Sequence, residues 1–304
     1  MARTDGDRMA KPTGVFGIVK KSASDFMADD CMSAAAALSY YTVFSLPALL
    51  VLILTLISTV MDPADVQGGM ARQIESLMGP GAATEVRTML EHAERPGGGL
   101  LPTLLGIGAL LFGATGAVMQ LQQTLNRTWG VKAEGGGLRG FLMKRVFSLG
   151  MILGLAFFLL VSLVASAALS AFGSSLERFG LPAPLLLALN FVISLVVIGL
   201  VFAAMFKVLP DAHIEWRDVW VGAGVTALLF MVGKFLIGFY LGKSNPGEAY
   251  GAAGSLAVLL VWIYYSSLIV LFGAEFTETW AERRGAGVEP EEGAVRVRRI
   301  VEPA

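Results

Sequence analysis

The side chains that catalysis or metal binding would need are scarce in this sequence. The chain has two histidines, His92 and His213, and a single cysteine, Cys31. It contains no Ser-His-Asp set, no Cys-His pair and no phosphate-binding loop of the GxxxxGK[ST] type. We therefore expect no catalytic residue, no bound metal, no cofactor and no enzymatic activity.

One compact polar set stands in the segment LPDAHIEWRD, which holds Asp211, His213, Glu215 and Asp218. Such a set could be a metal or nuclease site if its ligands were well spaced and supported by further hydrogen bonds. The alternative is a short connecting loop with Asp218 at the start of a helix, where the helix dipole favours a carboxylate. We favour the loop, and we expect no nucleic-acid partner.

The more informative polar residues lie within long apolar stretches. Polar groups in lipid are costly and tend to face a bundle interior or a wet cavity. The candidates to line such a cavity are Tyr40, Tyr41, Ser45, Gln120, Gln123, Asn126, Lys234, Tyr250, Tyr264 and Glu275. Each also has a plainer interpretation, since Lys234 can extend to the outer headgroups and the glutamines can bond neighbouring helices.

The elements that carry these residues are predicted to be membrane-spanning helices. The chain of 304 residues is 55% hydrophobic and only 15% charged, whereas soluble domains carry about 25% charged residues. Six stretches are long enough to cross a bilayer as helices, and Lys234 is the one charge within them. They are residues 31–61, 96–126, 146–176, 179–206, 219–242 and 249–274. The predicted fold class is all-α, a polytopic membrane protein with six transmembrane helices.

The basic residues give the predicted orientation. Of the 23 Lys and Arg residues, 17 fall in segments 1–30, 127–145, 207–217 and 281–304, which six spans place on one side. Five fall on the other side, and Lys234 is the remaining one. Because basic loops stay in the cytoplasm, both termini are predicted to be cytoplasmic.

The remaining segments complete the predicted organisation. Residues 1–30 form a cytoplasmic segment with a short amphipathic helix, whose Val15, Phe16, Val19 and Phe26 can lie on the membrane. Residues 31–280 form the transmembrane domain, with an extracytoplasmic helical hairpin at 62–99. Residues 281–304 are predicted to be a disordered cytoplasmic tail. The predicted hinge or packing positions are Pro47, Gly251, Gly254 and Gly273.

Counting along the spans predicts the depth of the polar groups. Tyr40, Tyr41, Gln120, Gln123 and Glu275 are expected at one level, in the inner half of the bilayer. Lys234 is expected about 15 Å away, in the outer half. Glu275 follows the run LIVLFGA and ends the last predicted span, so it faces either the glutamines and Tyr41 or the headgroups.

Several motifs resemble those of the YihY/BrkB family of bacterial inner-membrane proteins, historically labelled ribonuclease BN-like. They are AALSYYTVFSLPALL, LQQTLNRTWGV, VLPDAHIEWRDVWVGAGVTALLF, GKFLIGFYL and YGAAGSLAVLLVWIYYSSLIVLFGAEF, in order over about residues 15 to 285. The resemblance implies six spans with cytoplasmic termini and a link to the envelope, virulence and lipid handling. It implies no settled biochemical activity.

Two hypotheses about function follow. The first is a protein that moves or accommodates a lipid-like, anionic amphipathic molecule through a polar cavity, with membrane lipids as partners and Lys234 attracting the headgroup. The second is a scaffold that moves nothing and binds envelope proteins through its outer hairpin or its basic inner loops. The ribonuclease label is disfavoured, because RNA cleavage needs a hydrophilic site and a basic groove or aromatic platform.

Overall fold

The structure is a computed structural model. It describes residues 14–57, 115–133, 183–244, 254–285, 288–291 and 293–297, together with positions 62, 67–69, 72, 75 and 150. Within these residues, the side chains of 47–57, 183–190, 241–244 and 255 are not described. The predicted hairpin at 62–99 and the predicted span at 146–176 therefore lie almost wholly outside the described residues, and Tyr250 and Gly251 lie outside them too.

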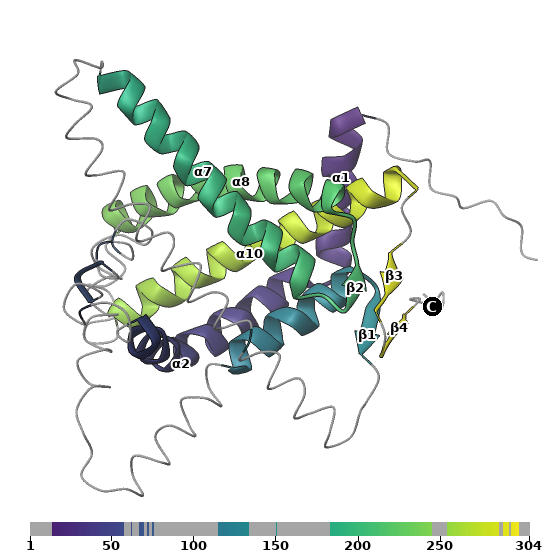
Figure 1. The fold of residues 1–304 in the computed structure, drawn as a ribbon, viewed down its shortest axis with the longest axis horizontal. Helices are drawn as coiled ribbons and strands as arrows, with labels where there is room; N and C mark the ends of the chain where they lie inside the picture. Colours follow the sequence, from purple (N-terminus) through teal and green to yellow (C-terminus); the bar gives the residue numbers. More distant parts are fainter. Residues whose placement is uncertain are drawn as a thin grey trace, which may run out of the picture.

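Long helices occupy four of the six predicted apolar stretches (Figure 1). They are α2 (Cys31–Ile57), α7 (Ala183–Val208), α8 (Trp216–Ser244) and α10 (Gly254–Arg283). Residues 115–128 form a further helix at the end of the predicted stretch 96–126. Within the described residues, three helical segments are long and apolar enough to cross a membrane, namely Phe191–Val208, Trp216–Tyr240 and Leu256–Arg283. The mainly helical class is confirmed, and the number of spans stays a prediction.

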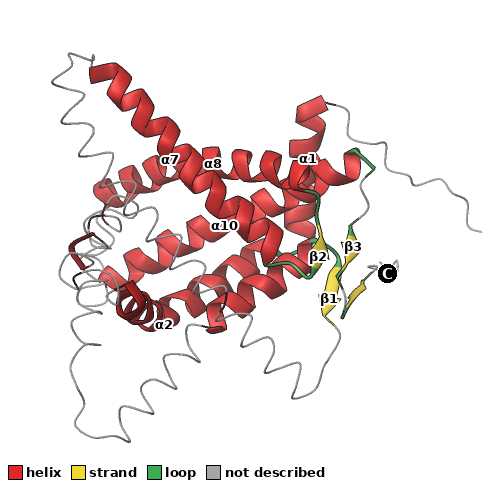
Figure 2. Cartoon of the chain, in the orientation of Figure 1, coloured by secondary structure: helices red, strands yellow, loops and turns green. Residues whose placement is uncertain are grey.

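The helix α10 is the centre of the bundle, since it packs against α8, α2 and the N-terminal helix α1 (Gly14–Ala28). The helix α7 packs against α8, and its Phe206 lies in one core cluster with Ala223 of α8 and Ala274 of α10. Short strands gather at the end of the bundle where α1 also lies (Figure 2). The helix α2 continues through Pro47, and a hinge at this residue stays a prediction.

A reciprocal contact of small residues joins α8 to α10. A methyl group added at Gly222 would overlap Thr277, and one added at Gly273 would overlap Thr226. Each threonine hydroxyl donates to the glycine carbonyl one turn earlier on its own helix, at 2.7 Å for Thr226 and 2.6 Å for Thr277. Small residues let helix backbones approach closely in lipid, so Gly273 lies in the helix contact where the sequence placed a packing glycine. Gly254, another predicted packing position, is buried at the start of α10.

The helix α1 lies against the bundle with one face and leaves the other exposed. Ile18, Ser22 and Phe26 are buried, and the Phe26 ring lies 6.2 Å from that of Phe272 on α10. Val15 and Phe16 are exposed. The prediction that Phe26 lies on the membrane is therefore wrong, because this ring gains more contacts within the core than at an interface.

A left-handed residue connects α1 to α2. Asp30 has a φ of 52°, a conformation that Asp adopts more readily than most residues. Its carboxylate accepts a hydrogen bond from the Ser33 hydroxyl at 2.8 Å, and its carbonyl accepts one from the Ala34 amide at 3.1 Å. This turn fixes the end of α1 next to Cys31, the first residue of α2.

Strands form where the sequence predicted a disordered tail. β3 (Glu289–Pro290) pairs with β2 (Ala212–His213), and β4 (Ala294–Arg296) pairs with β1 (Val131–Ala133). The prediction over 281–304 is therefore wrong for these residues, and α10 itself continues to Arg283. Gly130 makes the pairing feasible, since its φ of 58° ends the helix 115–128 and turns the chain into β1. Its carbonyl accepts a bond from the Val297 amide at 2.8 Å.

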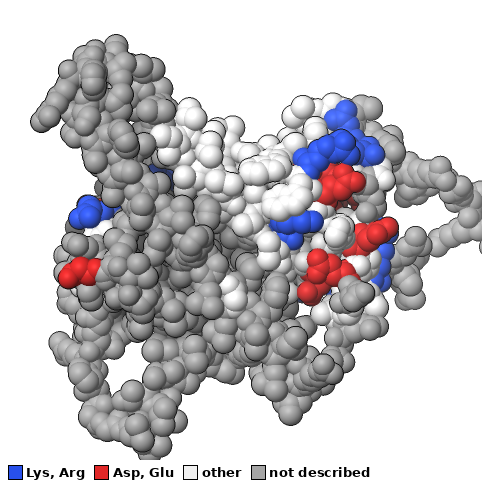
Figure 3. Space-filling model, viewed as in Figure 1, with Lys and Arg blue, Asp and Glu red and all other residues white. Residues whose placement is uncertain are grey.

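Charged side chains separate from apolar ones along the bundle. Figure 3 shows most of the blue and red groups gathered over the end that carries the strands, while the described surface between the two ends is largely white. A few charges lie at the opposite end. This distribution agrees with a protein whose middle faces hydrocarbon and whose ends face water.

Candidate functional site

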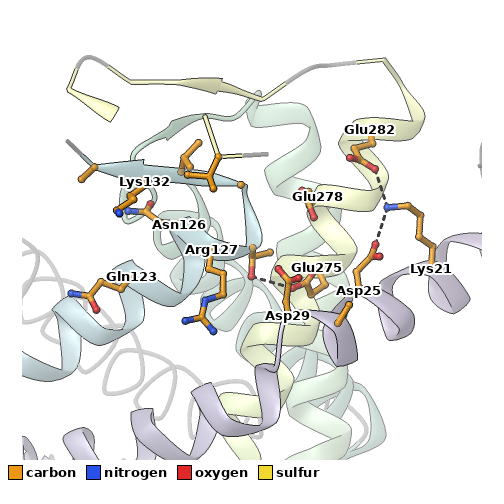
Figure 4. Close-up of a pocket in the computed structure, with 16 residues that line it drawn as sticks. Lys21, Asp25, Asp29, Gln123, Asn126, Arg127, Lys132, Glu275, Glu278 and Glu282 are labelled. Atoms are coloured by element: carbon orange, nitrogen blue, oxygen red, sulfur yellow. Dashed lines mark hydrogen bonds and ion pairs between the residues drawn. The ribbon is translucent and has the colours of Figure 1, made fainter. Parts of the chain in front are cut away.

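A cavity of about 760 Å³ lies at the charged end of the bundle (Figure 4). We call it the Glu275 cavity. Its walls come from α1, the helix 115–128, β1, α10 and Val297 beyond β4. Its charged lining residues are Lys21, Asp25, Asp29, Arg127, Lys132, Glu275, Glu278 and Glu282. Gln123, Asn126 and Thr128 add uncharged polar groups. The volume falls within the range of about 300–1,000 Å³ typical of ligand pockets.

Glu275 is the most buried charged residue in the described part of the chain, with a relative exposure of 0%. Its Oε1 accepts hydrogen bonds from the Cys31 thiol at 3.4 Å and from the Thr128 hydroxyl at 3.1 Å. One oxygen thus joins the start of α2, the end of helix 115–128 and α10. Its Oε2 is buried and has no hydrogen-bond partner within the described residues.

The ammonium group of Lys21 lies at the rim of the cavity and is paired with carboxylates of the protein itself. Its Nζ donates to Asp25 at 2.8 Å and to Glu282 at 2.9 Å, which ties α1 to the end of α10. Burial lowers the pKa of Lys21, but the hydrogen bonds and charges of Asp25 and Glu282 outweigh it and raise this pKa above its ordinary value. Lys21 therefore stays charged at neutral pH.

The charges that line the cavity do not balance. Five carboxyl groups face three cationic side chains, and Lys21 is already engaged by two of those carboxylates. In Figure 4, Glu278 and Glu282 follow Glu275 along α10, while Asp29 lies beside Glu275. The inner part of the cavity is consequently the more acidic part.

Asn126 lines the cavity, but its polar atoms are already used. Its amide nitrogen donates to the Asp211 carboxylate at 2.7 Å, and its amide oxygen accepts from the Asp211 backbone at 2.8 Å. Gln122 donates to the other carboxylate oxygen at 3.1 Å. The predicted cavity residue Asn126 is thus part of a clamp that holds the α7–α8 connection onto the helix 115–128.

The polar set of LPDAHIEWRD is a connection with structural contacts. Asp218 is buried in the first turn of α8. Its carboxylate forms an ion pair with Arg284 at 3.3 Å. Together with His213, Glu215 and Glu289 it lines a smaller cavity of about 270 Å³. Among the described residues, no group of three or more His, Cys, Asp or Glu side chains could hold a metal ion.

The structure does not bring the two tyrosines of α2 to Glu275. Tyr40 and Tyr41 are 58% and 45% exposed, and neither lines the Glu275 cavity. Glu275 instead contacts Cys31, about 14 Å earlier along α2 at 1.5 Å per residue. The expectation that these groups share one level is corrected, because α2 packs on α10 with its first turn, and not its third, beside Glu275.

The other predicted cavity residues are distributed along the bundle. Gln123 lines the Glu275 cavity, whereas Gln120 accepts a bond from Thr124 through its backbone carbonyl. Ser45 is buried and donates to the Thr42 carbonyl at 3.1 Å. Tyr264 packs against the cluster that contains Phe26, Leu38 and Leu271.

Lys234 lies far from the Glu275 cavity. The α8–α10 contact pairs Gly222 with Thr277 and Thr226 with Gly273, so Glu275 is level with a point between residues 222 and 226. Lys234 is about ten residues farther along α8, or about 15 Å. Its side chain is partly buried.

Several residues of this cavity do not stand out in the sequence. Cys31 reads there as a small interfacial residue, and Thr128 has no distinguishing pattern. Lys21 and Asp25 on α1 and Asp29 just beyond its end recur at intervals of four, and Glu275, Glu278 and Glu282 recur at three and four along α10. Such spacing places side chains on one helix face. This spacing could therefore have predicted that α1 and α10 each present charged side chains to a common site.

The fold and the cavity define a helical membrane protein with a charged, partly unpaired polar site at one end of its bundle. The family model of the virulence factor BrkB matches residues 22–298. The chain therefore belongs to this family, which confirms the resemblance seen in its motifs. No solved structure matches it significantly.

Relatives support the membrane assignment. A UPF0761 membrane protein of Azotobacter vinelandii is 30% identical over 259 residues, covering 82% of this chain and 60% of its own length. A UPF0761 membrane protein of Psychromonas ingrahamii is 28% identical, covering 84% of each chain. A protein of Bacillus subtilis named as ribonuclease-like, YfkH, is 25% identical over 88% of this chain and 96% of its own. The chain spans about 60% of the length of the first of these relatives.

Proposed function

We propose that this protein binds and moves a lipid-like or amphipathic molecule across a bacterial inner membrane, without converting it chemically. The observation that carries the proposal is the Glu275 cavity, a space of about 760 Å³ with charged walls at the end of a bundle of apolar helices. The polar group of the molecule enters this cavity while its apolar part stays against the helices. The proposal includes six spans with both termini in the cytoplasm, which puts the cavity at the cytoplasmic end.

The charges that line the Glu275 cavity indicate which charge the polar group of the moved molecule should carry. The sequence suggested an anionic headgroup, attracted by Lys234. An anionic group at the Glu275 cavity would meet five carboxyl groups and three cationic side chains, so this end favours a positive charge. Lys234 keeps its proposed role at the other end, where it would attract a negative group.

The scaffold hypothesis predicts a different kind of result. Its main surface, the hairpin at 62–99, falls almost entirely outside the described residues. A scaffold needs no unpaired carboxyl oxygen in a buried cavity, whereas a transporter needs a polar group that its ligand can pair with. The unpaired Oε2 of Glu275 therefore favours movement of a ligand.

Reconstituted vesicles test the proposal. Fluorescent lipid analogues with cationic, zwitterionic or anionic headgroups are placed in one leaflet, and their appearance in the other is followed by chemical quenching. We expect the wild-type protein to speed the exchange of at least one analogue, and Glu275→Gln and Lys234→Met to slow it by about tenfold or more, as expected for the loss of a hydrogen bond to a charged group.

Glu215→Gln is the matched control, because it removes a surface carboxylate that is paired with Arg217 outside the cavity. Exchange no faster than in protein-free vesicles, for every analogue, would overturn the proposal. Lipid exchange at the wild-type rate by both Glu275→Gln and Lys234→Met would show that neither the Glu275 cavity nor Lys234 takes part in the movement.

A further inference from the structure

The inner wall of the Glu275 cavity has one polar atom that the described residues leave unsatisfied. Glu275 is fully buried, and its Oε1 is occupied by the Cys31 thiol and the Thr128 hydroxyl. Its Oε2 has no hydrogen-bond partner among the described residues. A buried carboxyl oxygen without a partner costs free energy, so a group that donates to it would be bound.

The neighbours of Glu275 decide the sign of that group. Glu278, Asp29 and the cationic Arg127 line the same cavity, and Figure 4 shows Asp29 beside Glu275. With Glu275 itself, three carboxyl groups face one guanidinium group there. The two neutral donors that reach Glu275 are already on Oε1. A donor that also carries positive charge would satisfy Oε2 and offset the carboxyl groups around it.

The size of the cavity argues against a bare metal ion. No group of three or more His, Cys, Asp or Glu side chains within the described residues is close enough to hold one. The cavity of about 760 Å³ also exceeds the space that an ion needs. An organic ammonium group instead has up to three N–H donors and can reach carboxyl groups that are too far apart to share a metal.

The protein already shows this chemistry on the rim. Lys21 presents an ammonium group to Asp25 at 2.8 Å and to Glu282 at 2.9 Å. Glu278 and Glu275 stand on the preceding turns of α10 and line the same cavity. The inner carboxyl groups thus resemble the outer arrangement, but among the described residues no ammonium group is bonded to Glu275.

We propose that the Glu275 cavity binds the primary ammonium group of an amphipathic molecule, with one N–H donated to Glu275 Oε2 and Glu278 and Asp29 facing the charge. This assignment rests on the proposed function, since it names the polar group of the molecule that is moved. It adds a selectivity that movement alone does not require.

Binding is measured by native mass spectrometry of the full chain in detergent, with four probes that separate charge from chain length. They are dodecylamine, butylamine, dodecyl phosphate and dodecanol. We expect one dodecylamine to bind, at least about tenfold more tightly than dodecyl phosphate or dodecanol. Glu275→Gln should weaken dodecylamine by at least about tenfold, while Glu215→Gln should bind it like the wild type.

The fold of the variant is checked by thermal unfolding. The amide introduced by Glu275→Gln would keep an oxygen to accept from Cys31 and Thr128, so this variant is expected to fold. If it does not, Glu278→Gln takes its place, because this side chain lines the cavity without a hydrogen bond to α2 or to helix 115–128. That variant should weaken dodecylamine severalfold.

Each outcome decides one of the two proposals. Equal binding of dodecylamine and dodecyl phosphate, or wild-type affinity in the folded variants, would overturn the ammonium site even if vesicles show lipid movement. If butylamine binds as tightly as dodecylamine, the ammonium site is supported, but its ligand is a small amine without a long apolar chain. That result would count against the movement of a lipid-like molecule.

Discussion

Two sides of the same stretch of α10 differ in almost every respect. Gly273 and Thr277 face α8 in a contact where every hydroxyl is bonded and no methyl group could be added. Glu275, between them in sequence, faces the other way into a cavity of about 760 Å³. One side is filled and satisfied, and the other is spacious and leaves a buried oxygen without a partner among the described residues.

The difference separates stability from function on one helix. The α8 side can only hold two helices together, because nothing can enter it. The cavity side forgoes packing and hydrogen bonds that a purely structural contact would use, and natural proteins tolerate such costs mainly at functional sites. Substitutions on the α8 side should therefore change the free energy of unfolding, and substitutions on the cavity side should change ligand binding and lipid exchange.

The largest effect is expected where the helices are closest. Gly222→Leu or Gly273→Leu would push a side chain into a threonine of the facing helix, and should lower the free energy of unfolding by about 3 kcal/mol or more. Gly224→Leu is the control, since its added Cβ meets nothing within 4 Å. Unfolding in a denaturing detergent measures the three variants.

Complementary substitution then tests the geometry of this contact. Gly273→Ala alone should destabilise the protein, and adding Thr226→Ala should restore part of the loss by removing the hydroxyl and methyl that the new Cβ overlaps. Additive losses in the double variant would contradict the reciprocal packing.

An intermediate effect is expected at Asn126, which lines the cavity yet serves the fold. Asn126→Ala removes two hydrogen bonds to Asp211 and leaves its carboxylate less satisfied, which should lower the unfolding free energy by about 2 kcal/mol. Gln122→Ala removes one bond and should cost about 1 kcal/mol. The same unfolding assay applies. Equal stability of Asn126→Ala and wild type would mean that the clamp contributes nothing.

The smallest effect is expected at the rim. Lys21→Met removes an ammonium group whose partners Asp25 and Glu282 are 32% and 51% exposed, so the loss should be at most about 1 kcal/mol and should shrink in high salt. Because the folded protein raises the pKa of Lys21, its contribution is complete below the unfolded pKa of about 10.4 and is lost only above it. Titration of Lys21 itself should therefore change the difference in melting temperature only above about pH 10. A difference that is already lost below about pH 9 would show that another group carries the effect.

The sequence predicts the apolar helices well, because the length of an apolar run directly reports what lipid requires. Helices α2, α7, α8 and α10 fall within or across the predicted stretches. Gly273 could be assigned to packing for the same local reason. The helix α10 continues past the predicted end of the last span at residue 274 to Arg283, where it gains contacts from α1.

The partners of Glu275 could not be predicted from the sequence. Cys31 is 244 positions away and Thr128 is 147, so their approach depends on how three helices slide along one another. Depth counting placed Tyr41 beside Glu275, which amounts to an error of almost three turns in that register. The strand β4 was missed because its only signal is a backbone pairing with β1, and backbone groups leave no pattern in a sequence.

Because Cys31 is bonded to Glu275, the reactivity of its thiol can be used to measure opening of the protein at this site. Cys31 is the single cysteine of the chain, and it is 1% exposed, so a thiol reagent can reach it only when the helices packed around it, α1 and α10 among them, move apart from α2 at this point. The rate of its alkylation would time that separation in unmodified protein, with no engineered label. Comparing this rate with the exchange of lipid across vesicles would show whether the site opens once for every molecule that passes.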